Sequence, residues 1–325
     1  MTSTSSPQNI GEVIGEMYQR ANNLGANAPE LALFQDEPPQ MASGDVGKSG
    51  YLQLGFARRG DRSILAQMKR RVPYLVQRAL YWDEALPQMP CVFMISTSGC
   101  ILQGDRLALD IHVAPEAFGH VTTQSATKIH SMVNNYAAQV QTIQIEQGGY
   151  LEMMPDPVIP HSGSRFITDT QITIHSTATL IYSEIIMSGR KYHPADQGFK
   201  FDVYSSRITA TDFDGKILFA ERYVLEPKKQ PLNSVGVMGP FHVFGNVILL
   251  TPQVHHDRIL ARMTPQYDAE TGIASGTSRL PNQCGLIFKV LGKETYQVKA
   301  GVRLFWRIAR EEILGVTLPE PFIWR

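Results

Sequence analysis

From Tyr51 onward, hydrophobic and polar residues alternate in short runs, which is typical of strands that are buried on one face. The clearest runs span residues 107–113, 137–146 and 171–185. Turn residues separate them at fairly regular intervals, at Gly148-Gly149, Pro155 to Pro160, Ser188-Gly189 and Asp214-Gly215. The last of these pairs stands between two alternating runs and predicts a hairpin. We therefore expect a mainly β fold, an extended solenoid-like or sandwich-like arrangement of many short strands.

Helical spacing of apolar residues occurs in three places. A short amphipathic helix is predicted over Ile10 to Tyr18, with Asn22, Asn23 and Gly25 as its stop. A second helix is expected at residues 254–263, where His255-His256 is interpreted as a solvated pair. A C-terminal helix is expected from Val302, with Gly315 as its cap. Its apolar face would carry Phe305, Trp306, Ala309 and Ile313.

Strands and amphipathic helices do not alternate as in βαβ units, which argues against a parallel sheet of the nucleotide-binding type. Residues 1–48 are polar and loop-like apart from the first helix, and residues 38–50 are rich in Pro, Gly and Ser. The sequence thus predicts an N-terminal extension with a flexible linker at residues 1–48. A single β-rich domain should follow at residues 49–325.

The charge balance narrows the classes of partner. Thirty Lys and Arg residues match thirty Asp and Glu residues, so no global field favours nucleic acid or an anionic membrane. The three cysteines form no CxxC pair, the N-terminus lacks the pattern of a signal peptide, and no apolar run is long enough to span a membrane. We expect a cytoplasmic protein with reduced thiols.

Three short motifs give weak signals. Residues 99–104 have the glycine spacing of a phosphate loop, but Asp105 stands where that loop needs a lysine. Residues 125–128 match S-x-x-K without the companion motifs of serine acyl-enzymes, and Arg59-Gly60-Asp61 is interpreted as a turn. The nine histidines show no zinc-binding spacing. One alternative nevertheless stays open: a β-barrel metal-dependent hydrolase that uses His112, His120 or His130 with a carboxylate.

Acidic residues beside turns are the remaining candidates for chemistry: Asp105, Glu152, Asp156 and Glu184. If they line an interior channel with Thr122 and Thr123, their oxygens would bind a divalent cation loosely and let it pass. In the alternative interpretation, each carboxylate caps a turn or pairs with Arg106, Arg165 or Arg190.

Five blocks of sequence agree in their order with one known family. They are SGCILQGDRLALDIHV at 98–113, VTTQSATKIH at 121–130, LEMMPDPVIPHSGSRF at 151–166, YSEIIMSGR at 182–190, and the closing helix with its final Pro-Phe-Ile-Trp. From about Gly50 to Arg325, the chain resembles the urease accessory proteins called UreD, or UreH in some bacteria. Ser98-Gly99-Cys100 departs from the more usual Gly-Gly pair of the first block.

This resemblance implies a scaffold rather than an enzyme. Such a protein would join a UreF-type helical accessory protein and a UreG-type GTPase on urease apoprotein during nickel loading, with no nucleic acid and no membrane as partner. Nickel(II) would be bound only in transit through an internal tunnel. Asp105, Glu152, Asp156 and Glu184 would line that tunnel, and Cys100 would bind nickel transiently or serve only as a small buried hydrophobe. A second alternative is a pure adaptor that never contacts nickel.

Overall fold

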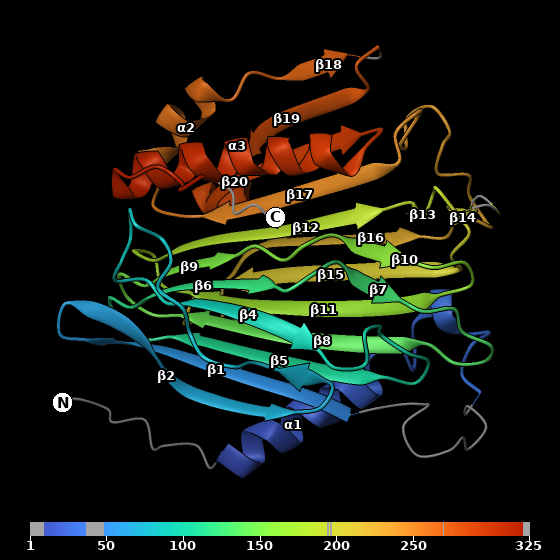
Figure 1. The fold of residues 1–325 in the computed structure, drawn as a ribbon, viewed down its shortest axis with the longest axis horizontal. Coiled ribbons are helices and arrows are strands. Elements are labelled where there is room, and N and C mark those ends of the chain that lie inside the picture. Colours follow the sequence, from blue (N-terminus) through green and yellow to red (C-terminus); the bar gives the residue numbers. More distant parts are fainter. Residues whose placement is uncertain (1–9, 37–48, 194, 196, 269, 321–325) are drawn as a thin grey trace.

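Two β-sheets stack face to face in the computed structural model, which describes residues 10–36, 49–193, 195, 197–268 and 270–320 (Figure 1). The smaller sheet has the strand order β16-β15-β11-β8-β5-β1-β2. Its strands are β1 (Ser49–Arg59), β2 (Arg62–Arg71), β5 (Arg106–Val113), β8 (Ala137–Ile145), β11 (Arg165–Ile174), β15 (Val203–Thr211) and β16 (Ile217–Leu225). The five strands from β1 to β15 pair in parallel, and antiparallel partners, β2 and β16, close its two edges.

The larger sheet has the order β18-β19-β20-β17-β12-β9-β6-β4-β3, with β10 and β7 attached beside β12. Its strands are β3 (Tyr74–Leu75), β4 (Cys91–Ser96), β6 (Phe118–Thr123), β7 (Thr127–Ile129), β9 (Tyr150–Met153), β10 (Val158–Pro160), β12 (Thr179–Met187), β17 (Val243–Leu250), β18 (Gln266–Asp268), β19 (Ile273–Arg279) and β20 (Gly285–Gly292). A separate pair consists of β13 (Gly189–Arg190) and β14 (Gln197–Gly198). Strands β4, β6, β9 and β12 are parallel neighbours.

Successive strands of the central region go to alternate sheets: β4, β6, β9 and β12 lie in the larger sheet, while β5, β8 and β11 lie in the smaller one. The chain therefore advances like a solenoid while building a sandwich. This confirms the predicted mainly β class, and the parallel order arises without crossover helices. The Asp214-Gly215 hairpin is confirmed between β15 and β16, and the turn at Arg59-Gly60-Asp61 joins β1 to β2.

The alternation of strand residues sorts side chains between two cores. On β12, Leu180 and Tyr182 face the core between the sheets, whereas Ile181 and Ile185 face the outer side. That outer side is covered by α3 (Thr295–Leu314), which packs Phe305 against Phe288 of β20 with ring centroids 5.2 Å apart. The larger sheet is thus buried on both faces here.

The remaining helical elements are α1 (Ile10–Asn23), η1 (Pro29–Leu31), η2 (Gln253–His255), α2 (His256–Arg262) and η3 (Pro281–Gln283). As predicted, α1 ends at Asn23, and its Met17 and Ala21 pack on Tyr51 at the outer face of the smaller sheet. Most of the predicted linker falls in residues 37–48, outside the described residues. No described helix has the length and hydrophobicity that a membrane crossing requires.

Two predictions about the C-terminal third are wrong. The last helix begins at Thr295, seven residues before the predicted Val302, because Glu294 and Gln297 form a capping box that starts it. Its predicted end is confirmed, since Gly315 adopts φ 71° at the C-cap. His255-His256 is not a solvated pair. His256 is buried and contacts the Thr251 carbonyl, while His255 contacts Glu312.

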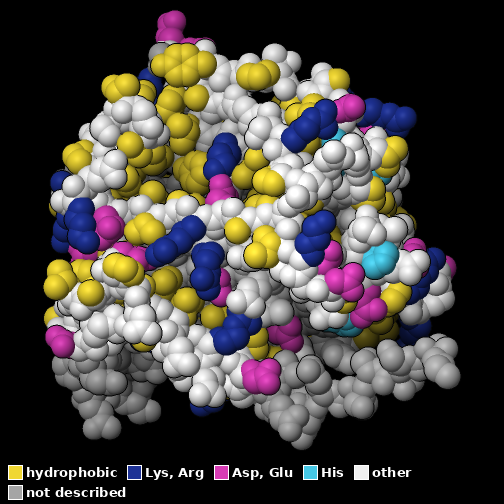
Figure 2. Space-filling model, turned by 180° about the vertical axis from the view of Figure 1, so that it is seen from behind, with side chains coloured by type: hydrophobic (Ala, Val, Ile, Leu, Met, Phe, Trp, Pro, Cys, Tyr) yellow, Lys and Arg dark blue, Asp and Glu magenta, His cyan; other side chains and the backbone are white. Residues whose placement is uncertain are grey.

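Hydrophobic side chains surround a hollow in the upper half of the face shown in Figure 2. This is the level of β17, β19 and β20 in Figure 1. The larger sheet continues past β17 through β20, β19 and β18, whereas the smaller sheet ends at β16. The two sheets therefore differ in width, and the larger one is only partly covered on its inner side.

Candidate functional site

Three of the predicted site residues line one cavity between the ends of β4, β5 and β7. Asp105, Cys100 and Thr123 share this cavity of about 120 Å³ with Tyr74 and Gln139. Asp105 is fully buried in the turn before β5, where its Oδ2 accepts the Leu102 backbone N–H at 2.8 Å. The structure thus brings a carboxylate, a thiol and a hydroxyl together at one cavity.

Glu184 lies on β12 and faces the core between the sheets. Its oxygens accept hydrogen bonds from the hydroxyls of Tyr223 at 3.1 Å, Tyr182 at 3.3 Å and Ser206 at 3.3 Å. Burial raises the pKa of the Glu184 carboxyl to about 7, because these hydroxyls only partly offset it and nearby Glu221 adds to the rise. The carboxyl therefore changes its charge near neutral pH.

A row of polar side chains runs from Glu184 across the inner face of the smaller sheet. Tyr223 of β16 lies opposite Ser206 of β15, which lies beside Thr168 of β11. Thr168 lies beside Gln139 of β8, whose Nε2 donates to the Tyr74 hydroxyl at 3.1 Å. Buried polar groups normally find hydrogen-bond partners, yet the Thr168 hydroxyl contacts none among the described residues.

This row ends at the cavity that contains Asp105. Tyr74 lines that cavity, and burial, followed by the nearby Asp105 carboxylate, raises the pKa of the Tyr74 hydroxyl well above its usual range. Polar residues of six strands and one turn therefore form a series with Glu184 at one end and Asp105 at the other, linked in part by hydrogen bonds and in part only by strand register. We call this set the interior polar row: Glu184, Tyr223, Ser206, Thr168, Gln139, Tyr74 and Asp105.

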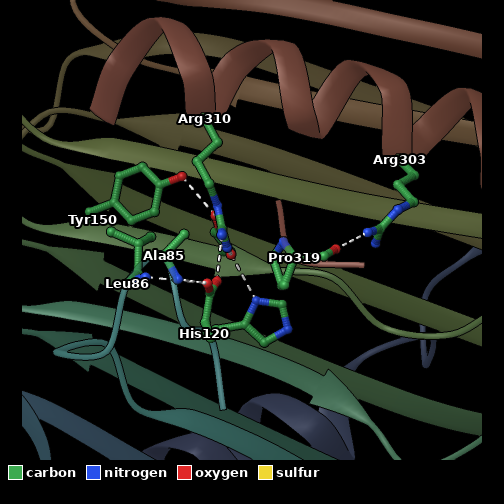
Figure 3. A network of polar contacts seen from close by, with 9 residues as sticks. Ala85, Leu86, His120, Tyr150, Arg303, Arg310 and Pro319 are labelled. Atoms are coloured by element: carbon green, nitrogen blue, oxygen red, sulfur yellow. Dashed lines mark hydrogen bonds and ion pairs between the residues drawn. The ribbon is translucent and has the colours of Figure 1, made fainter. Parts of the chain in front are cut away.

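Glu152 lies on the outer face of the larger sheet, the face opposite to that of Glu184, and is covered by α3. Its carboxylate accepts Arg310 Nε at 2.8 Å and Arg310 Nη2 at 2.7 Å, together with the His120 ring and the Tyr150 hydroxyl, both at 2.8 Å. Figure 3 shows Arg310 pointing from α3 toward Tyr150 and His120. Arg310 also pairs with the buried carboxylate of Asp83. Four donor atoms thus hold the two oxygens of Glu152.

Arg310 determines the charge of this network. Burial alone would raise the pKa of the Glu152 carboxyl, but the Arg310 guanidinium and the His120 hydrogen bond hold it well below its usual range. Glu152 is therefore ionised at any physiological pH. The network joins the C-terminal helix to β9 and to the loop before β4, which is a structural task for this carboxylate.

Asp156 and Thr122 line a separate groove of about 500 Å³ between α3 and the larger sheet. Asp156 Oδ1 accepts Lys299 Nζ of α3 at 2.9 Å, and the Thr122 hydroxyl donates to the Met154 carbonyl at 2.8 Å. Thr123, the next residue along β6, faces the other side, because successive strand residues point to opposite faces. Its Oγ1 accepts the Asp156 backbone N–H at 2.9 Å.

Comparison with known proteins identifies the family. A sequence model described as UreD urease accessory protein matches residues 48–325. The chain is 94% identical over 325 residues, the full length of both chains, to the urease accessory protein UreD of Photorhabdus laumondii subsp. laumondii. The protein of the same name from Yersinia pseudotuberculosis is 66% identical over 322 residues, and that of Yersinia enterocolitica serotype O:8 is 64% identical over 328 residues. Both alignments cover 99% of this chain and 100% of the relative.

The chain belongs to the UreD family of urease accessory proteins. The family predicted from the five sequence blocks is thereby confirmed. The predicted site residues of this UreD-family chain divide into three places: the cavity at Asp105, the interior at Glu184, and the α3 side with Glu152, Asp156 and Thr122. Their role as nickel ligands stays a prediction.

The histidines of the alternative hydrolase lie apart. His112 contacts Glu146, His120 lies under α3, and the His130 ring lies 5.7 Å from the His161 ring. Within the described ranges, no group of three or more His, Cys, Asp or Glu residues could hold a metal ion. The described part of the chain therefore lacks the ligand set that this alternative requires.

Two features of the site are not predicted by the sequence. No sequence pattern marks Arg310, although it is the largest fully buried side chain among the described residues. Tyr182, Tyr204 and Tyr223 surround Glu184, and burial, followed by the Glu184 charge, raises the pKa of each hydroxyl well above its usual range. The sequence does contain one signal for this cluster: Tyr182 lies two residues before Glu184, so both side chains point to the same face of the strand.

Proposed function

We propose that this protein acts in urease maturation as a non-enzymatic scaffold for nickel insertion into the urease active site. The observation that carries the proposal is the full-length identity of 94% to a urease accessory protein of the UreD family. At that identity a changed role would require changes at the functional positions, and only a small fraction of positions differ. The cytoplasm is the proposed compartment.

The proposed partners are urease apoprotein, a UreF-type helical accessory protein and, through the complex, a UreG-type GTPase. GTP hydrolysis is assigned to the partner. In this chain, Asp105 stands where a phosphate loop would have its lysine, and it is buried with its oxygen on the Leu102 N–H. A buried carboxylate at this position repels a nucleotide phosphate, which supports a scaffold rather than a GTPase.

Nickel(II) is the proposed cargo, and no permanently bound cofactor is proposed. The interior polar row supports this part of the proposal because it presents carboxylate, hydroxyl and amide oxygens in succession from Glu184 to Asp105. Oxygen ligands of this kind bind a divalent cation weakly, and weak successive sites favour passage over storage. The Cys100 thiol beside Asp105 would add a stronger ligand at one end.

The deciding experiment is a deletion in the natural host with nickel in excess. Cells without this protein should make normal amounts of urease polypeptide with little urease activity, and the wild-type gene should restore activity. Normal activity in the deletion strain would contradict the proposed function.

A second candidate is a pure adaptor that never contacts nickel. The engagement of Glu152 with Arg310 favours it in part, because that carboxylate already has a structural task. Replacing Glu184 by Ala separates the two candidates once the folded yield has been checked. The passage proposal predicts that the complex with partners still assembles while urease activation falls. The adaptor candidate predicts loss of both together or of neither.

A further inference from the structure

Among the described residues, one edge of the smaller sheet has no neighbouring strand. Strand β2 stands last in that sheet, has β1 as its only partner within the described ranges, and lies at the lower end of the stack in Figure 1. Residues 66–72 are exposed at every position, so side chains on both faces of the strand reach solvent. We call residues 66–72 the open edge. An open strand edge is a template for pairing with another chain.

The register shows which backbone groups of the open edge point outward. The Phe56 carbonyl of β1 accepts the Ala114 N–H, so it faces away from β2. Because backbone direction alternates along a strand, Gln53 and Tyr51 face β2, where they pair with Lys69 and Arg71. The N–H and C=O groups of the intervening Met68 and Arg70 therefore point outward. No hydrogen bond links those groups to any other described residue.

Nearer the hairpin turn, the same edge is closed. The Ser63 backbone N–H donates to the Gln88 carbonyl at 2.9 Å, and the Ser63 carbonyl accepts the Tyr81 hydroxyl at 2.9 Å. The loop before β4 thus supplies there the partners that a neighbouring strand would provide. The strand edge is therefore capped within the chain at Ser63, in contrast to the open edge at residues 66–72.

The charge of this hairpin is strongly positive although the whole chain is neutral. Residues 58–71 contain one acidic residue, Asp61, and six basic residues: Arg58, Arg59, Arg62, Lys69, Arg70 and Arg71. All six are exposed, and none forms an ion pair with a described residue. Positive charge that no described carboxylate neutralises attracts an acidic surface.

We propose that the open edge binds an extended acidic segment of a partner protein, which adds to the smaller sheet as a further strand next to β2. The outward N–H and C=O groups of Met68 and Arg70 would pair with the segment's backbone. Lys69, Arg70 and Arg71 would select its carboxylates. In this binding mode, hydrogen bonds between the two backbones provide the affinity and side-chain contacts provide the specificity. The binding does not depend on any nickel path.

The open edge favours a peptide over the other polyanions. Nucleic acids and anionic membranes offer phosphates to the same cations, but they have no backbone N–H and C=O groups to complete a ladder. The charges alone would also protect the edge from self-association. The test therefore has to separate strand pairing from charge.

The test uses the full-length protein and two fluorescein-labelled decapeptides of alternating Glu and Val. One is unmodified, and the other carries N-methyl groups at alternate backbone nitrogens, which block strand pairing without a change in charge. Fluorescence anisotropy should show binding of the unmodified peptide, weakening steeply with salt, and at least about tenfold weaker binding of the methylated one.

Two pairs of variants assign the binding to the open edge. Met68→Pro removes one outward N–H without a change in charge and should weaken binding about tenfold, whereas Met68→Ala should change it less than about twofold. Lys69→Glu with Arg71→Glu should abolish binding, whereas the exposed pair Lys200→Glu with Lys216→Glu should leave it nearly unchanged. Circular dichroism checks that each variant is folded.

Three results would overturn the proposal. Equal affinity for both peptides, or wild-type affinity of Met68→Pro, would show that only charge binds the peptide. Equal losses in the two charge-reversal pairs would place the site elsewhere. Tighter binding of duplex DNA or of phosphatidylserine vesicles than of the unmodified peptide, abolished by Lys69→Glu with Arg71→Glu, would assign the patch to a phosphate-bearing partner.

Discussion

Glu152 and Glu184 lie on adjacent parallel strands of one sheet, yet they face opposite sides and are in opposite electrostatic states. Glu152 of β9 faces α3, where the Arg310 guanidinium makes two hydrogen bonds to it. Glu184 of β12 faces the interior, where hydroxyl groups are its hydrogen-bond donors among the described residues. Burial raises the pKa of Glu184 to about 7, whereas on Glu152 Arg310 and His120 outweigh burial and lower the pKa.

The difference shows that burial alone does not determine what a carboxylate can do. A buried carboxylate beside a cation is a permanent ion and serves as a structural anchor. A buried carboxylate among hydroxyls gains or loses its proton near neutral pH, and its charge has no internal partner to neutralise it. Only the second kind is available to a passing cation.

The largest expected effect on stability comes from removing the Arg310 guanidinium, which is the cation bound to Glu152. Arg310→Met leaves Glu152 and Asp83 buried without their partner and should lower the free energy of unfolding by about 3–5 kcal/mol. Urea denaturation followed by circular dichroism measures the loss. Arg307→Met, at an exposed position of the same helix, should change the free energy by less than about 0.5 kcal/mol. Equal losses in both variants would remove the distinction between anchor and surface.

The second prediction concerns the pH dependence of Glu184. Its pKa is about 7 in the folded protein against an ordinary 4.5, so the folded state binds the proton more tightly than the unfolded state. Stability from this group is therefore present below pH 4.5 and is lost as the pH rises through 7. Between pH 5 and pH 8, the wild type should lose on the order of 3 kcal/mol relative to Glu184→Gln.

Unfolding of both proteins at the two pH values checks this prediction. A difference between wild type and Glu184→Gln that stays constant from pH 5 to pH 8 would show that Glu184 does not titrate in this range. The comparison with Glu152 would then lose its electrostatic basis.

The smallest expected effect is a difference in the free energy of unfolding between variants of two interior threonines, Thr168 and Thr170. Thr168→Val removes a hydroxyl that has no partner among the described residues and should change the free energy of unfolding by less than about 1 kcal/mol. Thr170→Val removes the acceptor of the Gln141 Nε2 hydrogen bond, 2.9 Å long, and should cost about 1–2 kcal/mol. A larger loss for Thr168→Val would mean that its hydroxyl is part of the hydrogen-bonded structure.

The fold was largely predictable because its signal is local. Alternation along β8, β11 and β12 and the turn at Asp214-Gly215 encode the strands within a few residues. The cap at Gly315 is equally local, but the start of α3 is not evident from the sequence because residues 295–301 lack a clear apolar face.

The site was predictable only in part because its contacts are remote in sequence. Arg310 contacts Asp83, which is 227 positions away in the sequence, and no local sequence pattern predicts such a pair. The split of Thr122 from Thr123 could have been foreseen, since adjacent strand residues face opposite sides. The register that joins Ser206, Thr168 and Gln139 into one row depends on the solenoid order of the strands.

The most direct test of the central claim, that nickel passes along the interior polar row at Glu184, is urease activation in a purified system. Apo-urease, the partner accessory proteins, GTP and nickel are combined with wild-type protein or with Glu184→Gln, and the rate of appearance of urease activity is measured at pH 7.5. Passage of nickel along the row predicts that Glu184→Gln copurifies with its partners as the wild type does, while activation slows about tenfold or more. Wild-type activation by a folded, partner-bound Glu184→Gln protein would contradict it.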